Sequence, residues 1–124
     1  MMTPSQDSAP PINGVLETAL YVDDMPRAVR FFADVLGLPV MLRTDRLTAF
    51  DAGASSVLLV FARGASQADV TGERGTVPGH DGAGPLHMAL RISADAYDGW
   101  KARLEAHGVT LRGEMSWPAG GRSL

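Results

Sequence analysis

The chain has 124 residues, of which 45% are apolar and 20% charged, and its formal net charge is −3. This length and composition indicate one soluble globular domain and exclude a two-domain enzyme, a disordered chain and a membrane protein. The acidic excess argues against nucleic acid as a partner, because nucleic-acid-binding proteins usually present a basic face. The chain contains no cysteine and three histidines, so any metal site must use imidazole and carboxylate ligands.

Residues 1–14, MMTPSQDSAPPING, are polar and rich in proline, and they lack the basic and apolar regions of a signal peptide. We therefore expect a flexible tail. No apolar run in the sequence reaches the roughly 18 residues that a membrane span needs. We expect no membrane partner and a cytoplasmic protein.

Residues 15–22 alternate between two faces, which predicts a strand. A helix is expected next, because Asp24 suits an N-cap, Pro26 suits the first turn and Gly37 suits the end. Three antiparallel strands are expected at 38–44, 46–50 and 55–62, giving a β-α-β-β-β module over residues 15–63. In the first strand, the apolar face should lie against the helix and the opposite face should carry Glu17, Ala19 and Tyr21.

Residues 64–85 are rich in glycine and follow neither a helical nor a strand period, which predicts a long connecting loop. Loops of this length are usually functional or disordered. His80 lies in this loop, and two interpretations stay open for it: a lid residue over a site, or a solvated side chain.

The second half repeats the pattern of the first. Residues 86–93, LHMALRIS, match residues 16–23, LETALYVD, in the order of their apolar positions and place His87 opposite Glu17. A second helix should follow, with its buried stripe at Tyr97, Trp100 and Leu104, and then a strand at 109–115. We therefore expect a second module over residues 86–124.

The repeat also predicts which side chains share a cavity. Leu86, Met88, Leu90 and Ile92 should lie against the second helix, and His87 and Arg91 should occupy the opposite face. If two curved sheets face one cavity, Glu17 and His87 both point into it. Tyr21 and Arg91 could orient an anionic substrate there, although Arg91 could instead pair with Glu17. Trp117 lies either near the cavity mouth or in an ordinary loop.

Several stretches resemble the vicinal oxygen chelate superfamily, which includes glyoxalase I, extradiol dioxygenases, fosfomycin-resistance enzymes and bleomycin-binding proteins. They are ALYVDDMPRAVRFFADVLGL, GPLHMALRI, EAHGV and WPAGGRSL. The resemblance runs from Val15 to the last residue. It implies an α+β fold of two paired βαβββ modules that form a half-open barrel around a divalent metal.

In that family, metal ligands commonly come from the first and last strands of each module. The resemblance therefore places ligands at Glu17 and His87, with Glu17 standing where many members have histidine. Residues 55–62 offer no ligand, and only 16 residues follow Gly108, so the second module is expected to be incomplete after its second strand begins. A fragment, completion by another chain and a defective enzyme are all open, and we expect a truncated chain.

The function implied is a glyoxalase-like lyase or isomerase acting on a small substrate that a divalent metal (Zn, Ni, Mn, Co or Fe(II)) chelates through two adjacent oxygens. Glu17 would be both ligand and catalytic base. The alternatives are a metal-free drug- or small-molecule-binding protein of the bleomycin-resistance type and an extradiol-type dioxygenase. A homodimer is expected, with modules that pair either within one chain or between two. The residues expected to bind substrate are Tyr21, Arg91, His80 and Trp117.

Overall fold

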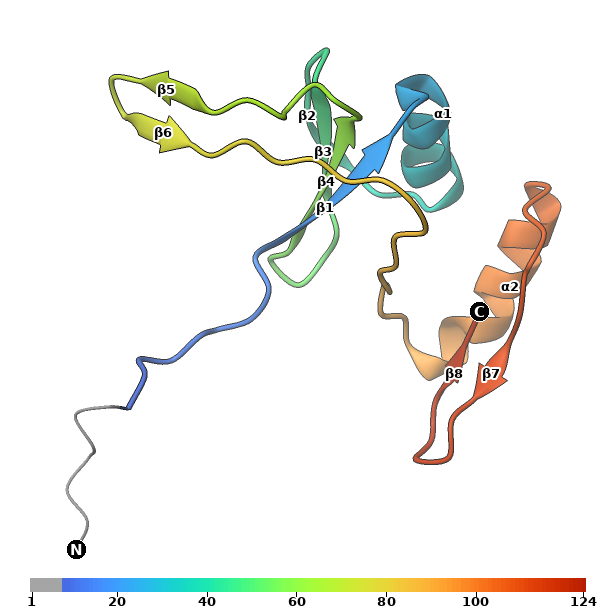
Figure 1. Ribbon diagram of the computed structural model, residues 1–124. Coiled ribbons are helices and arrows are strands. Elements are labelled where there is room, and N and C mark those ends of the chain that lie inside the picture. Colours follow the sequence, from blue (N-terminus) through green and yellow to red (C-terminus); the bar gives the residue numbers. More distant parts are fainter. Residues whose placement is uncertain (1–7) are drawn as a thin grey trace, which may run out of the picture.

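The computed structural model describes residues 8–124 (Figure 1). The described part of the predicted tail, residues 8–14, is exposed and contains neither helix nor strand, and residues 1–7 lie outside the described residues. Between residues 8 and 124, every helix is too short or too polar to cross a membrane.

The first half forms a four-stranded sheet with one helix, which confirms the predicted β-α-β-β-β order. The sheet has the order β1-β4-β3-β2, so β1 lies at one edge. Strand β1 runs parallel to β4, whereas β3 is antiparallel to both β2 and β4. The elements are β1 (Glu17–Val22), α1 (Met25–Val29) with its π-helical continuation η1 (Arg30–Val35), β2 (Val40–Arg43), β3 (Leu47–Asp51) and β4 (Val57–Ala62).

The helical segment formed by α1 and η1 begins and ends where the sequence predicts. The Asp24 carboxylate accepts a hydrogen bond from the backbone N–H of Arg27 at 3.0 Å, and Pro26 lies in the first turn. This bond satisfies one of the N–H groups that a helix start leaves free. Gly37 has φ of +73°, the left-handed conformation in which glycine ends helices at little cost.

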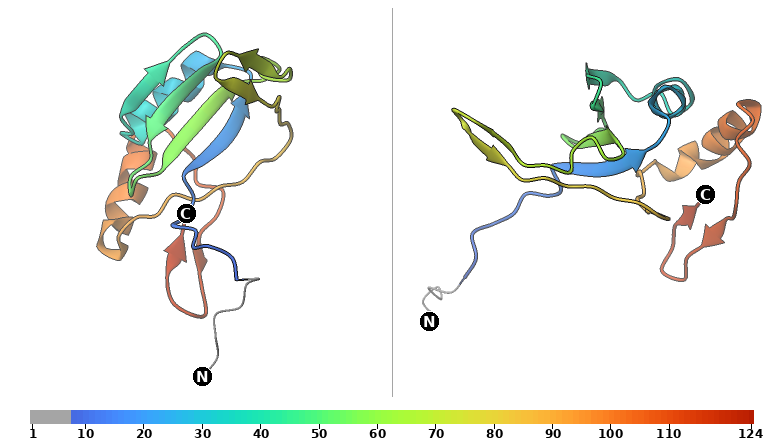
Figure 2. Two further views of the ribbon diagram at one scale, coloured as in Figure 1. Left: turned by 90° about the vertical axis from the view of Figure 1, so that its left-hand side faces the viewer. Right: turned by 45° about the horizontal axis from the view of Figure 1, so that its top comes forward.

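The core lies between α1 and one face of the sheet (Figure 2). Phe50, Leu58 and Val60 are fully buried there and pack with Ala28 of the helix. Burial of each large apolar side chain contributes about 1.5–3 kcal/mol. Leu20 packs against this cluster from β1, as the predicted apolar face requires. The alternate residues of β1 therefore lie on the face of the sheet that α1 leaves uncovered.

The predicted loop at 64–85 contains a small hairpin, formed by β5 (Val70–Gly72) and β6 (Gly75–Val77). Val70 pairs with Val77, and the hydroxyl groups of Thr71 and Thr76 are 2.9 Å apart. These cross-strand pairs stabilise the hairpin. Each strand has only three residues, one of them a glycine, so its alternation is hard to recognise in the sequence. The prediction of a wholly irregular loop was wrong for these residues.

The predicted strand at 86–93 is also wrong in this structure, because the segment joins no sheet. Leu86, Leu90 and Ile92 remain 38–47% exposed, and only Met88 packs against the core of the first half. A strand needs a neighbour for its N–H and C=O groups. The described part of the chain leaves this segment without one.

The second helix is present as predicted, as η2 (Ala94–Ala96) followed by α2 (Tyr97–Ala106). Tyr97 is buried, and Gly108, with φ of +75°, follows the helix end. The predicted strand at 109–115 is reduced to β7 (Met115–Ser116), which pairs with β8 (Arg122–Ser123). Figure 1 shows this orange and red part beside the four-stranded sheet rather than over its open face.

One arginine joins the two halves. Arg103 of α2 donates from Nε to the carbonyl of Val35 at 2.6 Å and from Nη2 to the carbonyl of Asp34 at 3.0 Å. Both carbonyls belong to the last turn of the first helix, where acceptors lack intrahelical partners and a cation is favourable. The second helix therefore acts as a cap on the first.

Candidate functional site

The uncovered face of the sheet carries a hollow of about 410 Å³. Its floor comes from β1, β4 and the start of β3, and its wall from the hairpin β5–β6 and the loop that follows it. Most of this surface is apolar, with a few polar groups, as is usual for small-molecule sites. The lining residues are Glu17, Ala19, Tyr21, Arg46, Leu47, Leu59, Phe61, Ser66, Ala68, Val70, Val77, Pro78 and His80.

Glu17 and Tyr21 mark two different ends of the hollow. Both lie on the same face of β1, separated by four residues, which corresponds to about 13 Å along a strand. Glu17 is exposed, and the three ion pairs within residues 8–124 all use other carboxylates. Its carboxylate is therefore available to a ligand.

The Tyr21 end is a cluster of three rings. The Tyr21 hydroxyl lies 2.7 Å from Nδ1 of His80, and the Tyr21 ring stacks on Phe61 with centroids 5.7 Å apart. Phe61 and His80 are in edge-to-face contact, with ring centroids 4.5 Å apart. His80 is therefore partly buried in the ring cluster, and its role as a residue over the site stays a prediction.

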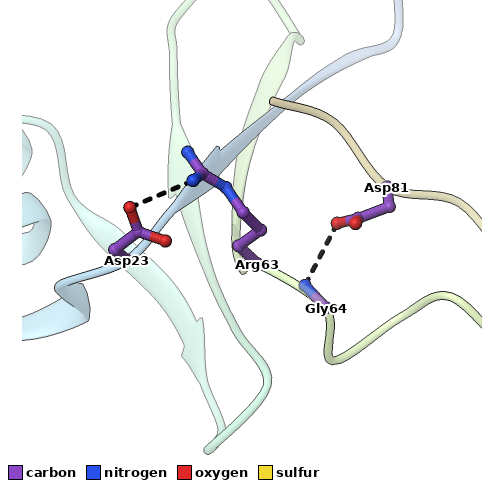
Figure 3. Close-up of polar contacts among 4 residues, drawn as sticks. All are labelled: Asp23, Arg63, Gly64 and Asp81. Carbon is purple, nitrogen blue, oxygen red and sulfur yellow. Dashed lines mark hydrogen bonds and ion pairs between the residues drawn. The ribbon is translucent and has the colours of Figure 1, made fainter. Parts of the chain in front are cut away.

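Two carboxylates fix the loop that carries His80. Asp69 accepts from the N–H of Gly79 at 2.7 Å. Asp81 accepts from the N–H of Gly64 at 3.1 Å, as Figure 3 shows. Asp81 also accepts from Nε2 of Gln67 at 3.0 Å. The hydrogen bonds from the Gln67 side chain and the Gly64 backbone lower the pKa of Asp81 below its ordinary value, since both favour the charged form. We call these contacts the carboxylate latch.

The loop also passes very close to Tyr21. A Cβ atom at Gly82 would lie 2.5 Å from Cδ2 of the Tyr21 ring, so this approach requires glycine. On the other side of the latch, Arg63 pairs with Asp23 at 3.1 Å, which joins the residues that follow β1 and β4 (Figure 3). The ring cluster is thus held by the ends of two parallel strands and by the loop above them.

Ser66 adds an unusual group to this end. Its side chain is buried, with 4% of the residue exposed, and its hydroxyl has no hydrogen-bond partner among the described residues. Its backbone carbonyl accepts from the N–H of His80 at 2.8 Å, which places the two residues side by side in the wall. Buried polar groups without partners are rare and call for an explanation.

The structure brings together three of the six predicted site residues, Glu17, Tyr21 and His80, in one hollow. His87 and Arg91 are exposed on the segment at 86–93 and do not line it. Trp117 lies in the β7–β8 hairpin, where its Nε1 donates to the Ser123 hydroxyl at 3.0 Å. The predicted placement of these three residues around the same cavity is not found within one chain.

Sequence reasoning missed Phe61, Ser66 and Arg46. Phe61 could have been found, because it alternates with the buried Leu58 and Val60 in the predicted strand at 55–62. Nothing local in the sequence marks Ser66 or Arg46, since each reaches the hollow through the turn in which it lies.

No group of three or more ligating side chains that could hold a metal occurs among residues 8–124. Glu17 and His87 supply suitable atoms, an oxygen and an imidazole nitrogen, but one chain does not bring them into the same hollow. Within the described part of one chain, these two residues therefore do not share a site.

The first half is thus a βαβββ module with an open hollow on the uncovered face of its sheet. The chain belongs to the Glyoxalase/Bleomycin resistance protein/Dioxygenase superfamily, which matches residues 14–121. This membership confirms the predicted family and the α+β fold class, with a second module that is incomplete in its strands.

Among solved structures, the chain is similar to a lactoylglutathione lyase from Agrobacterium tumefaciens, with 30% identity and a TM-score of 0.81 over 91% of this chain and 84% of that one. It is also similar to an integron cassette protein from the mobile metagenome of the Halifax Harbour sewage outfall, with 17% identity and a TM-score of 0.62 over 90% and 95% of the two chains. The oxidase ChaP-H2 has 20% identity and a TM-score of 0.54 over 88% and 71%. The last two similarities concern the fold alone.

Proposed function

We propose that the protein is a divalent-metal-dependent lyase or isomerase of the glyoxalase type, acting on a small substrate bound in the hollow. The observation that carries this proposal is the exposed Glu17 carboxylate on the open face of the sheet, next to a largely apolar hollow of about 410 Å³. The similarity to a lactoylglutathione lyase at 30% identity supports the same class of chemistry.

A second copy of the chain is the proposed source of the other metal ligand. Strand β1 pairs only with β4, so its outer edge is free among the described residues. Residues 86–93 are unpaired and, apart from Met88, exposed, and an extended segment can add to a free strand edge. Such pairing would bring His87 of one copy to the face that carries Glu17 of the other and make the functional unit a homodimer.

When bound between Glu17 and His87, the metal would act as a Lewis acid toward two adjacent oxygens of the substrate. The chain's own residues perform the remaining tasks. The Glu17 carboxylate is suited to accept a proton from a substrate carbon next to a carbonyl and to return it at the neighbouring carbon. The floor, from Ala19 and Leu59 to Phe61, keeps water from the apolar part of the substrate.

A metal-free small-molecule-binding protein is the second candidate. The ring cluster of Tyr21, Phe61 and His80 favours it, because aromatic walls bind flat apolar ligands without a metal. An extradiol-type dioxygenase has less support, since Glu17 stands where that activity usually uses histidine.

Titration of Zn, Ni, Mn, Co and, under anaerobic conditions, Fe(II) into the metal-free protein tests the proposal by calorimetry. We expect binding in the parent protein, loss of binding in Glu17→Gln and His87→Ala, and unchanged binding in His107→Ala. His107 is a matched control, because it lies at the end of α2 and outside the hollow. Unchanged binding in both Glu17→Gln and His87→Ala would disprove the site, and a parent protein that binds no metal would favour the binding protein.

A further inference from the structure

We propose that the hollow contains a second binding position, at the Tyr21 end, that takes a carboxylate attached to an apolar or aromatic group. The reason is that hydrogen-bond donors gather at the Tyr21 end and the acidic side chain lies at the other end. The polar side chains of the Tyr21 end can each donate a hydrogen bond, whereas the acidic side chain of the hollow, Glu17, stands at the opposite end of β1. This inference does not depend on metal binding.

The first donor is the Ser66 hydroxyl. It is buried in the wall and has no hydrogen-bond partner among the described residues. An unsatisfied hydroxyl is costly to bury, and because this oxygen has almost no accessible surface, a small shift of the wall would let a ligand accept its proton. A carboxylate oxygen is such an acceptor.

The second donor comes from the ring cluster. When the Tyr21 hydroxyl donates to Nδ1 of His80, the neutral imidazole carries its proton on Nε2. The carboxylate latch and the hydrogen bond from the His80 backbone N–H to the Ser66 carbonyl hold the backbone of His80 beside that of Ser66 in the wall. In this tautomer, the Nε2 proton is free to be donated to a ligand.

The charge comes from Arg46, which is the cationic side chain of the lining. Its backbone carbonyl accepts from the N–H of Ala62, so it lies at the same end of the sheet as Phe61. The three ion pairs within residues 8–124 use other cations, which leaves this guanidinium available to an anion. Charge-assisted bonds of this kind are stronger than neutral ones.

Two acidic residues of the loop, Asp69 and Asp81, lie outside the lining of the hollow. Their carboxylates accept hydrogen bonds from Gly79, Gly64 and Gln67. The rest of the wall is apolar and fits the body of the ligand, through Leu59, Phe61, Ala68, Val70, Val77 and Pro78.

Phenylacetate and its neutral amide, phenylacetamide, are matched probes for the metal-free full-length chain. They have the same aromatic body, and only phenylacetate carries the charge. Calorimetry should show phenylacetate binding about tenfold more tightly than phenylacetamide, because the amide loses the charged contact. NMR signals of the His80 imidazole should shift with phenylacetate.

Arg46→Gln should weaken phenylacetate binding about tenfold, and Ser66→Ala should weaken it severalfold, with little effect on phenylacetamide in either variant. Arg30→Gln is the control, because Arg30 is an exposed arginine of η1 outside the hollow. Circular dichroism of each variant checks that it folds. Equal affinity for the two probes, or unchanged affinity in Arg46→Gln, would overturn the proposal.

A Glu17→Gln arm separates this inference from the proposed function. Phenylacetate affinity should be preserved in that variant, because the proposed position for the phenylacetate carboxylate is at the Tyr21 end, and Tyr21 lies about 13 Å from Glu17 along β1. If Glu17→Gln lost phenylacetate binding while Ser66→Ala retained it, phenylacetate would bind at the Glu17 end of the hollow. The proposed position at the Tyr21 end would then be wrong. Failure of metal binding, in contrast, leaves the expected result with phenylacetate unchanged.

Discussion

A mixture of two defective variants offers the sharpest test of the shared metal site. Glu17→Gln chains retain His87, and His87→Ala chains retain Glu17. In a two-fold dimer with sites that span two copies, each homodimer of a variant has no complete site. A heterodimer has one complete site and one that lacks both ligands. Two ligands within one chain would instead leave every site in every dimer incomplete.

The expected magnitude follows from the symmetry. Random exchange of equal amounts makes about half of the dimers heterodimers, so the mixture should bind about one quarter of the metal of the parent protein. Heterodimers purified through two different tags should bind about half. The metal content after gel filtration, measured by mass spectrometry, provides the assay. Purified heterodimers that bind no metal, alongside a parent protein that does, would refute pairing of residues 86–93 with β1 of another copy.

Three further outcomes concern the fold and the loop. Because hydrogen bonds lower the pKa of Asp81, the latch should hold at neutral pH and weaken only as the pH falls through a value below 3.8, measured as faster hydrogen exchange of the Gly64 amide. In Asp81→Asn, the Gly64 amide should exchange faster than in the parent protein at every pH at which Asp81 is charged. A Gly64 amide whose protection is changed neither by acid nor by Asp81→Asn would contradict the latch. Leu58→Ala should lower the free energy of unfolding by about 2–5 kcal/mol in urea titrations, whereas the half-exposed Leu42→Ala should lower it far less. Asp24→Ala should cost about 1 kcal/mol through loss of the N-cap, and an unchanged melting temperature would show that the cap contributes nothing.

The first half could be predicted from the sequence because its signals are local. The alternation around Leu20, the N-cap at Asp24 and the glycine at 37 each act within a few residues, and all three features are present in the structure. The uncovered face that carries Glu17 and Tyr21 follows from the same alternation. This part of the candidate site needed no knowledge of the rest of the chain.

The remainder depends on distant partners. Residues 86–93 have the composition of a strand, but a strand also needs a neighbouring edge, which local pattern does not supply. The position of His80 depends on hydrogen bonds that join Asp69 to Gly79 and Asp81 to Gly64, across 10 and 17 residues. A glycine-rich segment with two such carboxylates is held in place even though its composition is typical of a flexible loop.

The parallel pairing of β1 with β4 has a consequence for how this protein can vary. Because both strands end at the same edge, the residues that follow them meet there, as the contact between Asp23 and Arg63 shows. Changes in the connection that follows β4 would alter the chemistry of one end of the hollow without replacing a residue of the buried cluster around Leu58. The Glu17 end, in contrast, is part of the strand itself. The proposed reactive position at Glu17 thus lies within a strand and the proposed carboxylate position lies beside a connection, so a change in the connection can alter ligand preference without a new fold.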